Sequence, residues 1–286
     1  MKYAAVTPVR DDVENLERLA GSMAEQAHLP VAWIIVDNGS VDGTPALIER
    51  LAREYPWIRR LEIPGAPAVV RGAPIVRAFH AGLELVPSEA DVVVKLDADV
   101  SFGADYFDVL VGRFESDPQL GLASGTCYEW DRGQWRSRFA TRDQVRGATR
   151  AYRRACLDDV LPLEERMGWD SVDQLIAILR GWRTESFADL PFYHHRFTGE
   201  RDGSTRAWQL QGELAHYLGY RPSYLLVRTA YRTVREPAAA AMAWGYAAAA
   251  LRGDPRCTYD EVVRLLRRQQ ALRRLPKRVR EALGRA

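Results

Sequence analysis

Residues 32–44 read Ala-Trp-Ile-Ile-Val-Asp-Asn-Gly-Ser-Val-Asp-Gly-Thr, an apolar run that passes into acidic residues and glycines. The run Ala32–Val36 has the length and composition of a strand that is buried on both faces. Pro45 follows Thr44, which predicts a helix with Thr44 at its N-cap that continues to about Glu54. A buried strand joined to a helix by a short polar turn is the repeating unit of an α/β sheet.

The same alternation of strand and helix patterns continues on both sides of this unit. It predicts strands at 3–6, 58–63, 91–96, 120–128, 182–187 and 191–194, and helices after Asp11 or Asp12 and at 74–86, 106–115 and 170–180. Trp130 and Trp135 are predicted to lie in a loop rich in Trp and Arg. Residues 201–205 resemble a linker, and helical patterns follow at 208–218, 224–234, 238–251 and 259–275.

We therefore predict an α/β fold with a mixed, mostly parallel central sheet flanked by helices in residues 1–200, and a helical C-terminal extension in residues 201–286. The chain is 47% hydrophobic and 27% charged, which excludes disordered and fibrous classes. Its three cysteines are far apart and form no CxxC pair, which argues against a disulfide framework and a zinc site. No apolar leader follows Met1, so we expect a cytoplasmic protein.

Acidic groups gather at three places, each of which follows a predicted strand or begins a predicted helix. Asp37 ends the strand 32–36, where its carboxylate can accept hydrogen bonds from a base or sugar, and Gly39 permits a tight turn beside a ligand. The alternative is a plain strand-to-helix turn in which Asp42 and Thr44 cap the helix. Asp170 lies at the start of the helix 170–180, where it is either an N-cap or a general base.

Asp97 and Asp99 form an Asp-x-Asp at the end of the strand 91–96. Two carboxylates at a strand end suit a hard divalent cation that keeps open positions for phosphate oxygens, whereas the alternative is a solvated turn. His194 or His195 could complete the ligand set. Because neighbouring residues of a strand point to opposite faces, at most one of the two can do so, and either could instead be a hydrogen-bonded structural histidine.

Taken in order, these motifs resemble family 2 glycosyltransferases of the GT-A fold, over roughly residues 3–197. The resemblance rests on Thr7-Pro8-Val9-Arg10, residues 36–44, Gly72–Gly82, residues 96–99 and residues 168–181. It implies a nucleoside-diphosphate sugar donor, an inverting transfer to an acceptor hydroxyl of a saccharide, lipid-linked saccharide or small molecule, and a Mn²⁺ or Mg²⁺ cofactor. Polysaccharide or glycolipid synthesis at the cell surface is the process it suggests.

The resemblance also implies roles for individual residues. Donor-binding roles fall on Thr7, Pro8, Arg10, Asp37, Asn38, Gly39, Arg71, Asp97, Ala98 and Gly147. Asp99 and Asp97 would hold the cation, with His195 or His194. Asp170 would remove the acceptor proton, and Asp173, one helical turn away, is the alternative base. Asn38 replaces the usual second Asp of the family, and Trp169 stands where a Glu is expected.

Three other functions compete with this interpretation. A catalytically inactive nucleotide- or sugar-binding protein of the same fold would keep the binding residues. A phosphohydrolase with an Asp-x-Asp nucleophile needs a later lysine, but only Lys277 follows Asp99. A dinucleotide-dependent dehydrogenase needs a glycine-rich turn after the first strand, where this chain has Thr7–Asp12.

The net charge of +2 hides a strong asymmetry. Residues 217–286 hold 15 Lys or Arg against 5 Asp or Glu, which leaves the rest of the chain acidic. Segments 217–221 and 224–228 mix aromatic, aliphatic and Arg residues, as interfacial helices do, so we expect either contact with the inner face of the cell membrane or a helical cap. In the second case Arg264, Arg267, Arg268, Arg273 and Arg274 form a solvated or dimer surface. No nucleic-acid-binding module is recognisable.

Overall fold

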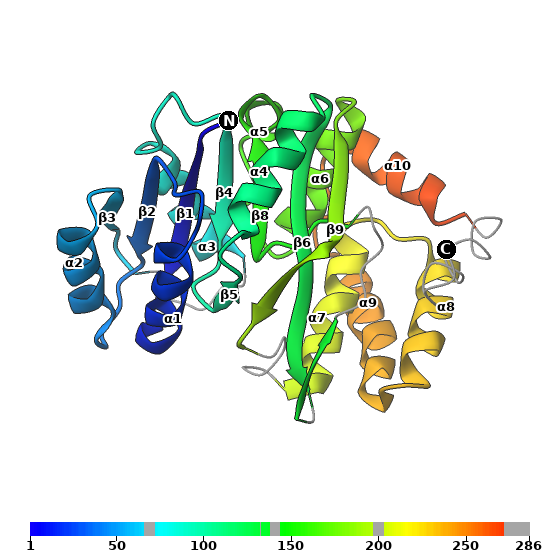
Figure 1. The fold of residues 1–286 in the computed structure, drawn as a ribbon. Coiled ribbons are helices and arrows are strands. Elements are labelled where there is room, and N and C mark those ends of the chain that lie inside the picture. Colours follow the sequence, from blue (N-terminus) through cyan, green and yellow to red (C-terminus); the bar gives the residue numbers. More distant parts are fainter. Residues whose placement is uncertain (66–71, 132, 138–143, 197–202, 272–286) are drawn as a thin grey trace. The chain divides into compact units, whose positions relative to one another are not determined.

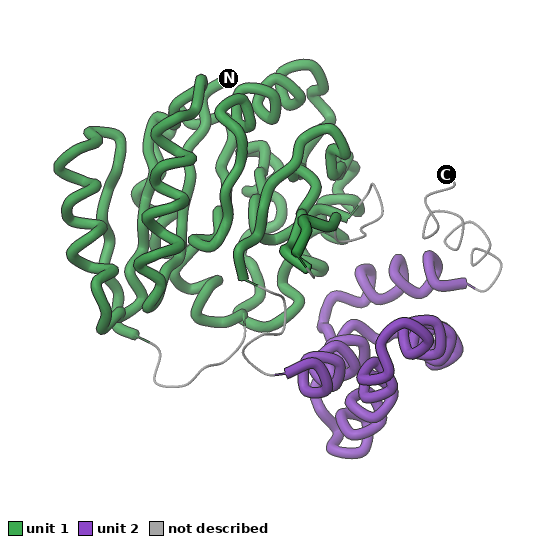
Figure 2. Tube along the Cα trace, turned by 60° about the horizontal axis from the view of Figure 1, so that its bottom comes forward, with its two compact units in different colours: residues 1–196 green, residues 197–286 purple. Residues whose placement is uncertain are grey.

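The computed structural model describes residues 1–65, 72–131, 133–137, 144–196 and 203–271. The chain divides into two compact units, residues 1–196 and 197–286, which are coloured separately in Figure 2. Arg71, Arg273 and Arg274 lie outside the described residues, as does most of the predicted loop after Ser137.

The first unit is built on one mixed sheet (Figure 1). Its strands are β1 (Tyr3–Val9), β2 (Ala32–Asp37), β3 (Ile58–Glu62), β4 (Val92–Leu96), β5 (Val100–Phe102), β6 (Leu120–Asp131), β7 (Gln134–Ser137), β8 (Thr149–Arg153) and β9 (Arg183–His194). Their order is β3-β2-β1-β4-β8-β6-β9-β5, and β7 pairs with β6. Strands β1 to β4, β6 and β9 run in one direction and β5, β7 and β8 in the other. The predicted mixed, mostly parallel sheet is therefore confirmed.

Helices cover both faces of this sheet. They are α1 (Val13–Ala24), α2 (Thr44–Glu54), α3 (Ala73–Leu83), α4 (Tyr106–Ser116), α5 (Arg154–Val160) and α6 (Trp169–Leu179). One core cluster joins the sheet to α1, α2 and α4, and the other joins it to α3, α5 and α6. Alternate residues of β1 serve the two cores, Tyr3 and Ala5 the first and Ala4 and Val6 the second. This division explains why the strands are apolar throughout.

Two segments of the first unit differ from the prediction. Trp130 and Trp135 do not lie in a loop but face each other across the β6–β7 hairpin. The two strands predicted at 182–187 and 191–194 are one strand, β9, whose pairing with β6 shifts register between Gly125 and Thr126. The shift brings Pro191 opposite Thr126, and a strand interrupted in this way looks like two strands in the sequence. The elements β5, β8 and α5 were not predicted.

The second unit is helical in its described part. It contains α7 (Gly203–Tyr217), α8 (Pro222–Thr233), the short 3-10 helix η1 (Pro237–Ala240), α9 (Ala241–Arg252) and α10 (Asp260–Gln269). Helices α7 and α9 approach closely at Gly212 and Gly245, where a Cβ would collide with the carbonyls of Met242 and Gln209. Helix α7 begins inside the predicted linker 201–205. Among the helices in the described parts of the chain, none is long and apolar enough to cross a bilayer.

Candidate active site

Strands β1, β2, β4 and β9 end at the same edge of the sheet, where ligands of open α/β sheets bind. Asp37 closes β2 with 1% of its surface exposed, and its Oδ1 accepts a hydrogen bond from the backbone N–H of Ser40 at 2.9 Å. Gly39 has a φ of +72°, and a Cβ there would lie 2.7 Å from the backbone of Gly65. Only glycine fits this turn, which holds the Asp37 carboxylate in place.

The end of β1 divides into a buried and an accessible part. Thr7 is fully buried, and its Oγ1 accepts a hydrogen bond from Trp33 Nε1 at 2.8 Å, so this hydroxyl is committed to the core. Pro8 is half-buried and Arg10 is exposed, with its Nε 3.6 Å from the carboxylate of Asp11. The backbone N–H of Asn38 donates to Val9 O at 2.9 Å and ties the ends of β1 and β2 together.

The Asp-x-Asp and one histidine converge at the centre of this edge. Ligand atoms of Asp97, Asp99 and His194 all lie within 4.8 Å of one another, and His194 Nε2 is 3.2 Å from Asp99 Oδ1. The buried Lys95 forms an ion pair with Asp97, and Arg196 lies 3.7 Å from the Asp99 carboxylate. Ala98, between the two aspartates, is buried. The structure thus gathers two carboxylates from the turn between β4 and β5 and an imidazole from the end of β9.

The charges of this cluster are strongly coupled. Burial opposes the charged form of His194, but hydrogen bonds to Asp99 and Glu129 outweigh it and raise the pKa of His194 to about 10. Burial alone would raise the pKa of Asp99, yet the hydrogen bond from His194 and the neighbouring positive charges lower it. The imidazolium therefore neutralises part of the acidic cluster in the absence of another cation.

The two adjacent histidines have different surroundings. His195 Nε2 lies 2.7 Å from Ser101 Oγ, and its ring packs edge-on against Trp135. Burial lowers the pKa of His195. Strand alternation separates the two rings, as the sequence predicted, and it is His194 that joins Asp97 and Asp99.

The ligating groups of Asp97, Asp99 and His194 suit the predicted cation. Two carboxylates and one imidazole match the preferences of Mn²⁺, and Mg²⁺ favours the carboxylate oxygens. Glu129 lies behind His194, 2% exposed, with an oxygen 3.8 Å from Nδ1. The sequence did not single out Glu129, because only the parallel pairing of β6 with β9 puts it opposite His194.

One short loop, residues 147–148, connects the neighbourhood of Asp170 with this cluster. It occupies the first turn of α6, half-buried, directly after Gly168 and Trp169. A Cβ on Gly147 would lie 3.5 Å from Asp170 Oδ2. Gly147 O accepts a hydrogen bond from Lys95 Nζ at 3.1 Å, and the backbone N–H of Asp97 donates to Ala148 O at 2.8 Å. Residues 147–148 therefore contact both the Asp-x-Asp segment and the first turn of α6.

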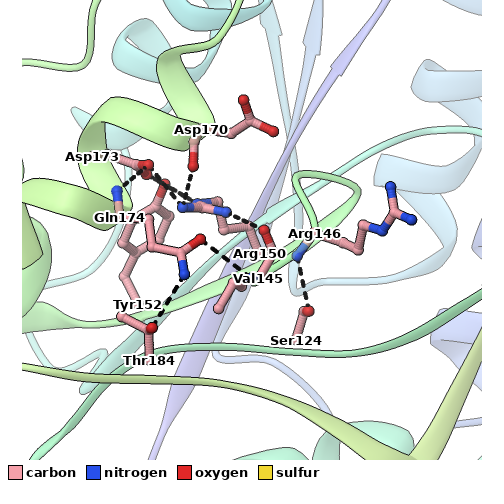
Figure 3. A network of polar contacts seen from close by, with 9 residues as sticks. All are labelled: Ser124, Val145, Arg146, Arg150, Tyr152, Asp170, Asp173, Gln174 and Thr184. Atoms are coloured by element: carbon pink, nitrogen blue, oxygen red, sulfur yellow. Dashed lines mark hydrogen bonds and ion pairs between the residues drawn. The ribbon is translucent and has the colours of Figure 1, made fainter. Parts of the chain in front are cut away.

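Asp173 has a different environment from Asp170. Its carboxylate is 2% exposed and forms an ion pair with the fully buried Arg150, while Tyr152 donates a hydrogen bond to Oδ2 at 2.5 Å. Figure 3 shows the Asp170 carboxylate pointing away from this network. Neither Arg150 nor Tyr152 was predicted from the sequence, since both lie on β8, which was not recognised.

Arg153 ends β8, and Arg154 begins α5. Arg153 donates to the carbonyls of Leu120, Phe114 and Asp117, and Arg154 to those of Pro87 and Ala90. Both side chains therefore connect backbone segments away from the acidic cluster.

An open α/β sheet with polar side chains gathered at its carboxyl edge is the architecture of a protein that binds ligands at the ends of its strands. Residues 4–161 match the sequence profile of glycosyl transferase family 2. The match spans more than half of the chain, so this chain belongs to glycosyl transferase family 2, and the resemblance drawn from the motifs is confirmed.

Similar proteins agree with this membership. Over 202 residues the chain is 25% identical to an N-acetylglucosaminyl-diphospho-decaprenol L-rhamnosyltransferase of Mycobacterium tuberculosis, a match covering 64% of this chain and 62% of the relative. The chain thus spans less than two thirds of the curated relative it matches.

Solved structures share the fold. A mannosyltransferase of Pyrobaculum calidifontis, in complex with GDP-Man and Mn²⁺, has a TM-score of 0.59 at 17% identity and covers 98% of this chain and 83% of its own. S. aureus TarS residues 1–349, in complex with UDP-GlcNAc, has a TM-score of 0.54 at 14% identity, covering 75% of this chain and 66% of that chain.

Proposed function

We propose that this protein is a glycosyltransferase that moves a sugar from a nucleoside-diphosphate sugar to the hydroxyl of an acceptor, with inversion at the sugar carbon and dependence on Mn²⁺ or Mg²⁺. The observation that carries this proposal is the placement of two kinds of carboxylate around residues 147–148. Lys95 and Asp97 bond the carbonyls of Gly147 and Ala148, and the Asp170 carboxylate lies beside Gly147. The transfer needs one group for the diphosphate and one for the acceptor hydroxyl, and both would lie near residues 147–148.

The donor is proposed to lie along the edge from Asp37 to Asp99. Asp37 would accept hydrogen bonds from the base, with Pro8, Arg10 and the Asn38–Gly39 turn beside it. Asp97 would contact the ribose or the cation, and Ala98 and Gly147 would give backbone close to the sugar. Thr7 would support this pocket from the core through Trp33. Donor complexes of structural neighbours, with GDP-Man and with UDP-GlcNAc, support this class of ligand.

The cation would be held by Asp99, Asp97 and His194. When bound, it supplies neutralisation of the charge that develops on the diphosphate leaving group. Because a ligating histidine must be neutral, binding would release the proton that the cluster keeps on His194. Lys95 would then remain as the partner of Asp97 and hold its orientation.

Asp170 is proposed as the general base that accepts the proton of the acceptor hydroxyl. Its carboxylate points away from the Arg150 network and is half-buried, so an acceptor can reach it (Figure 3). The buried ion pair with Arg150, which occupies both oxygens of Asp173, favours Asp170 over Asp173, the alternative base. A single displacement with one base gives inversion, and no second nucleophile is required.

The acceptor is proposed to be a lipid-linked saccharide in the synthesis of a cell-surface polysaccharide or glycolipid. The name of the mycobacterial relative, which acts on N-acetylglucosaminyl-diphospho-decaprenol, supports this class. An enzyme with such an acceptor works at the cytoplasmic face of a membrane, which agrees with the expected peripheral location.

We also propose that the second unit contacts anionic lipid, because a lipid-linked acceptor lies at a membrane surface. In α8, Leu226 is 61% exposed and Val227 43%, whereas Tyr217 and Leu218 are buried. Exposed aliphatic side chains beside Arg residues suit a lipid interface. The wild-type protein should float with vesicles of phosphatidylglycerol at low salt, and L226S/V227S should float less. Sedimentation of both proteins away from the vesicles would contradict lipid contact and favour a solvated or dimer surface.

The donor and cation parts of the proposal are tested by thermal denaturation with UDP-GlcNAc, GDP-mannose and other nucleotide sugars, with and without Mn²⁺. A ligand at 100 times its Kd should stabilise the protein by about 2.7 kcal/mol. We expect a Mn²⁺-dependent shift that Asp99→Ala abolishes, and slow hydrolysis of the donor that binds. Mn²⁺-dependent binding without turnover of any donor would instead favour an inactive nucleotide-binding protein.

A further inference from the structure

We propose that Arg150 is a positioning residue that fixes the loop 144–148 against the first turn of α6, and thereby sets the place of Asp170 relative to the segment that holds Asp97 and Asp99. The inference rests on the proposed role of Asp170 and extends it to side chains that touch neither substrate. Figure 3 draws the network that carries it.

The guanidinium of Arg150 reaches two separate backbone segments at once. Its Nη1 donates to Val145 O at 2.6 Å, and Nη2 donates to Asp170 O at 2.7 Å. Both contacts are made by one planar group with 0% exposure. Since the donors of a guanidinium have a fixed fork geometry, the two carbonyls are held at a defined separation.

Asp173 and Tyr152 hold the guanidinium in this orientation. Asp173 accepts from Arg150 Nε at 2.9 Å and from Nη2 at 2.7 Å, and Tyr152 donates to the same carboxylate. The ion pair is bidentate and has no freedom to rotate. Asp173 therefore determines which way Arg150 points, while Arg150 determines where the loop lies.

The loop is also held from its other sides. The backbone N–H of Val145 donates to Gln174 Oε1 at 3.2 Å, and that of Arg146 donates to Ser124 Oγ at 3.1 Å. Gln174 is itself bonded to Thr184 at 3.1 Å. Side chains from β6, β8 and α6 thus hold the loop 144–148, and Gln174 of α6 is in turn held by β9. The last two residues of the loop, Gly147 and Ala148, bond Lys95 and Asp97.

A buried ion pair is a poor means of adding stability, because the cost of desolvating two charges offsets their attraction. Apolar residues of similar volume can often replace such a pair without loss of stability. Apolar residues cannot, however, bond the carbonyls of Val145 and Asp170. The feature that would be lost is the geometry, and a displacement of about 1 Å at a reacting group can cost about 100-fold in rate.

The test compares three variants: Arg150→Lys, the paired change R150M/D173L, and the matched control Arg153→Lys. Arg153 lies in the same strand and also bonds backbone carbonyls, but at the end away from the site. Each folded variant is assayed for Mn²⁺-dependent donor binding, for kcat and KM of donor hydrolysis or transfer, and for amide hydrogen exchange at Val145 and Arg146.

We expect R150K and R150M/D173L to lose about 100-fold in kcat with KM for the donor nearly unchanged, and to exchange the amides of Val145 and Arg146 faster. R153K should lower the Tm with kcat and these amides unchanged. Wild-type kcat and exchange in folded R150K, or losses that follow Tm equally in R150K and R153K, would overturn the positioning role.

Failure of this inference can be separated from failure of the proposed function. If Asp170→Asn keeps wild-type turnover, the assignment of the base is wrong, whereas loss of turnover in D170N beside intact turnover in R150K contradicts only the positioning role. If the wild-type protein turns over no donor, the hydrogen-exchange comparison still decides whether Arg150 fixes the loop.

Discussion

The Nε2 atom of His194 lies 3.2 Å from Asp99 Oδ1, while its Nδ1 atom lies 3.8 Å from the buried carboxylate of Glu129. The imidazole is therefore held between Asp99, in the turn between β4 and β5, and Glu129 of β6. Glu129 can keep the proton on Nδ1, so that Nε2 faces Asp97 and Asp99. A carboxylate behind a ligating histidine commonly fixes its tautomer and strengthens its binding to a metal.

Glu129→Gln should weaken Mn²⁺ binding by about 10- to 100-fold, since the amide orients Nδ1 less firmly and does not increase the basicity of the ring. Isothermal titration of Mn²⁺ in the presence of the preferred nucleotide measures the change. Asp131→Asn, on the same strand and exposed beside Arg136, is the matched control and should bind Mn²⁺ normally. Equal affinities in all three proteins would contradict a role of Glu129 behind His194.

Asp173→Asn and Asp170→Asn should differ in stability. The first leaves the buried Arg150 without its counter-charge, and we expect a loss of about 3–5 kcal/mol in the free energy of unfolding. The second removes a half-buried carboxylate outside the ion pair, and it should change stability by less than about 1 kcal/mol. Urea denaturation of both variants measures this. Equal stabilities would mean that Asp173 is not the partner of a buried charge.

His80 should make the first unit sensitive to mild acid. Burial lowers its pKa below the model-peptide value of 6.5, and its Nε2 accepts a hydrogen bond from the backbone N–H of Leu163 at 3.2 Å. The unfolded chain takes up this proton at higher pH than the folded chain. The associated stability is therefore present above pH 6.5 and is lost as the pH falls from there toward the lower folded-state pKa.

Urea denaturation at pH 7.5 and 5.5 checks this expectation. The wild-type protein should lose more stability over that interval than His80→Gln, whose amide can still accept from Leu163 but does not titrate. An identical pH dependence of wild type and H80Q would show that the proton on His80 is not coupled to folding.

The parts of the fold and site that could be predicted are those written into contiguous sequence. Asp37, Asp97 and Asp99 each follow a buried apolar strand, so their position at the carboxyl edge follows from local pattern alone. Helix α2 ends at Glu54 as predicted, but it begins one residue earlier than predicted, because Gly43 and not Thr44 is its N-cap. The start signal of Thr44 and Pro45 is local and places the helix to within one residue.

Glu129 and Arg150 could not be found in the same way. Glu129 meets His194 only because β6 pairs with β9, across about sixty intervening residues whose pairing no local signal fixes. Arg150 lies inside the short strand Thr-Arg-Ala-Tyr-Arg, which has no clear strand pattern in the sequence. Its burial depends on Asp173, which arrives from helix α6.

The central claim is that Asp170 is the base of a glycosyl transfer, and Asp170→Asn tests it most directly. With a donor and acceptor that the wild-type protein turns over, Mn²⁺-dependent donor binding should be unchanged in D170N, while kcat falls by about 10²- to 10⁴-fold. Turnover by D170N at the wild-type rate, with a normal pH profile, would contradict the claim.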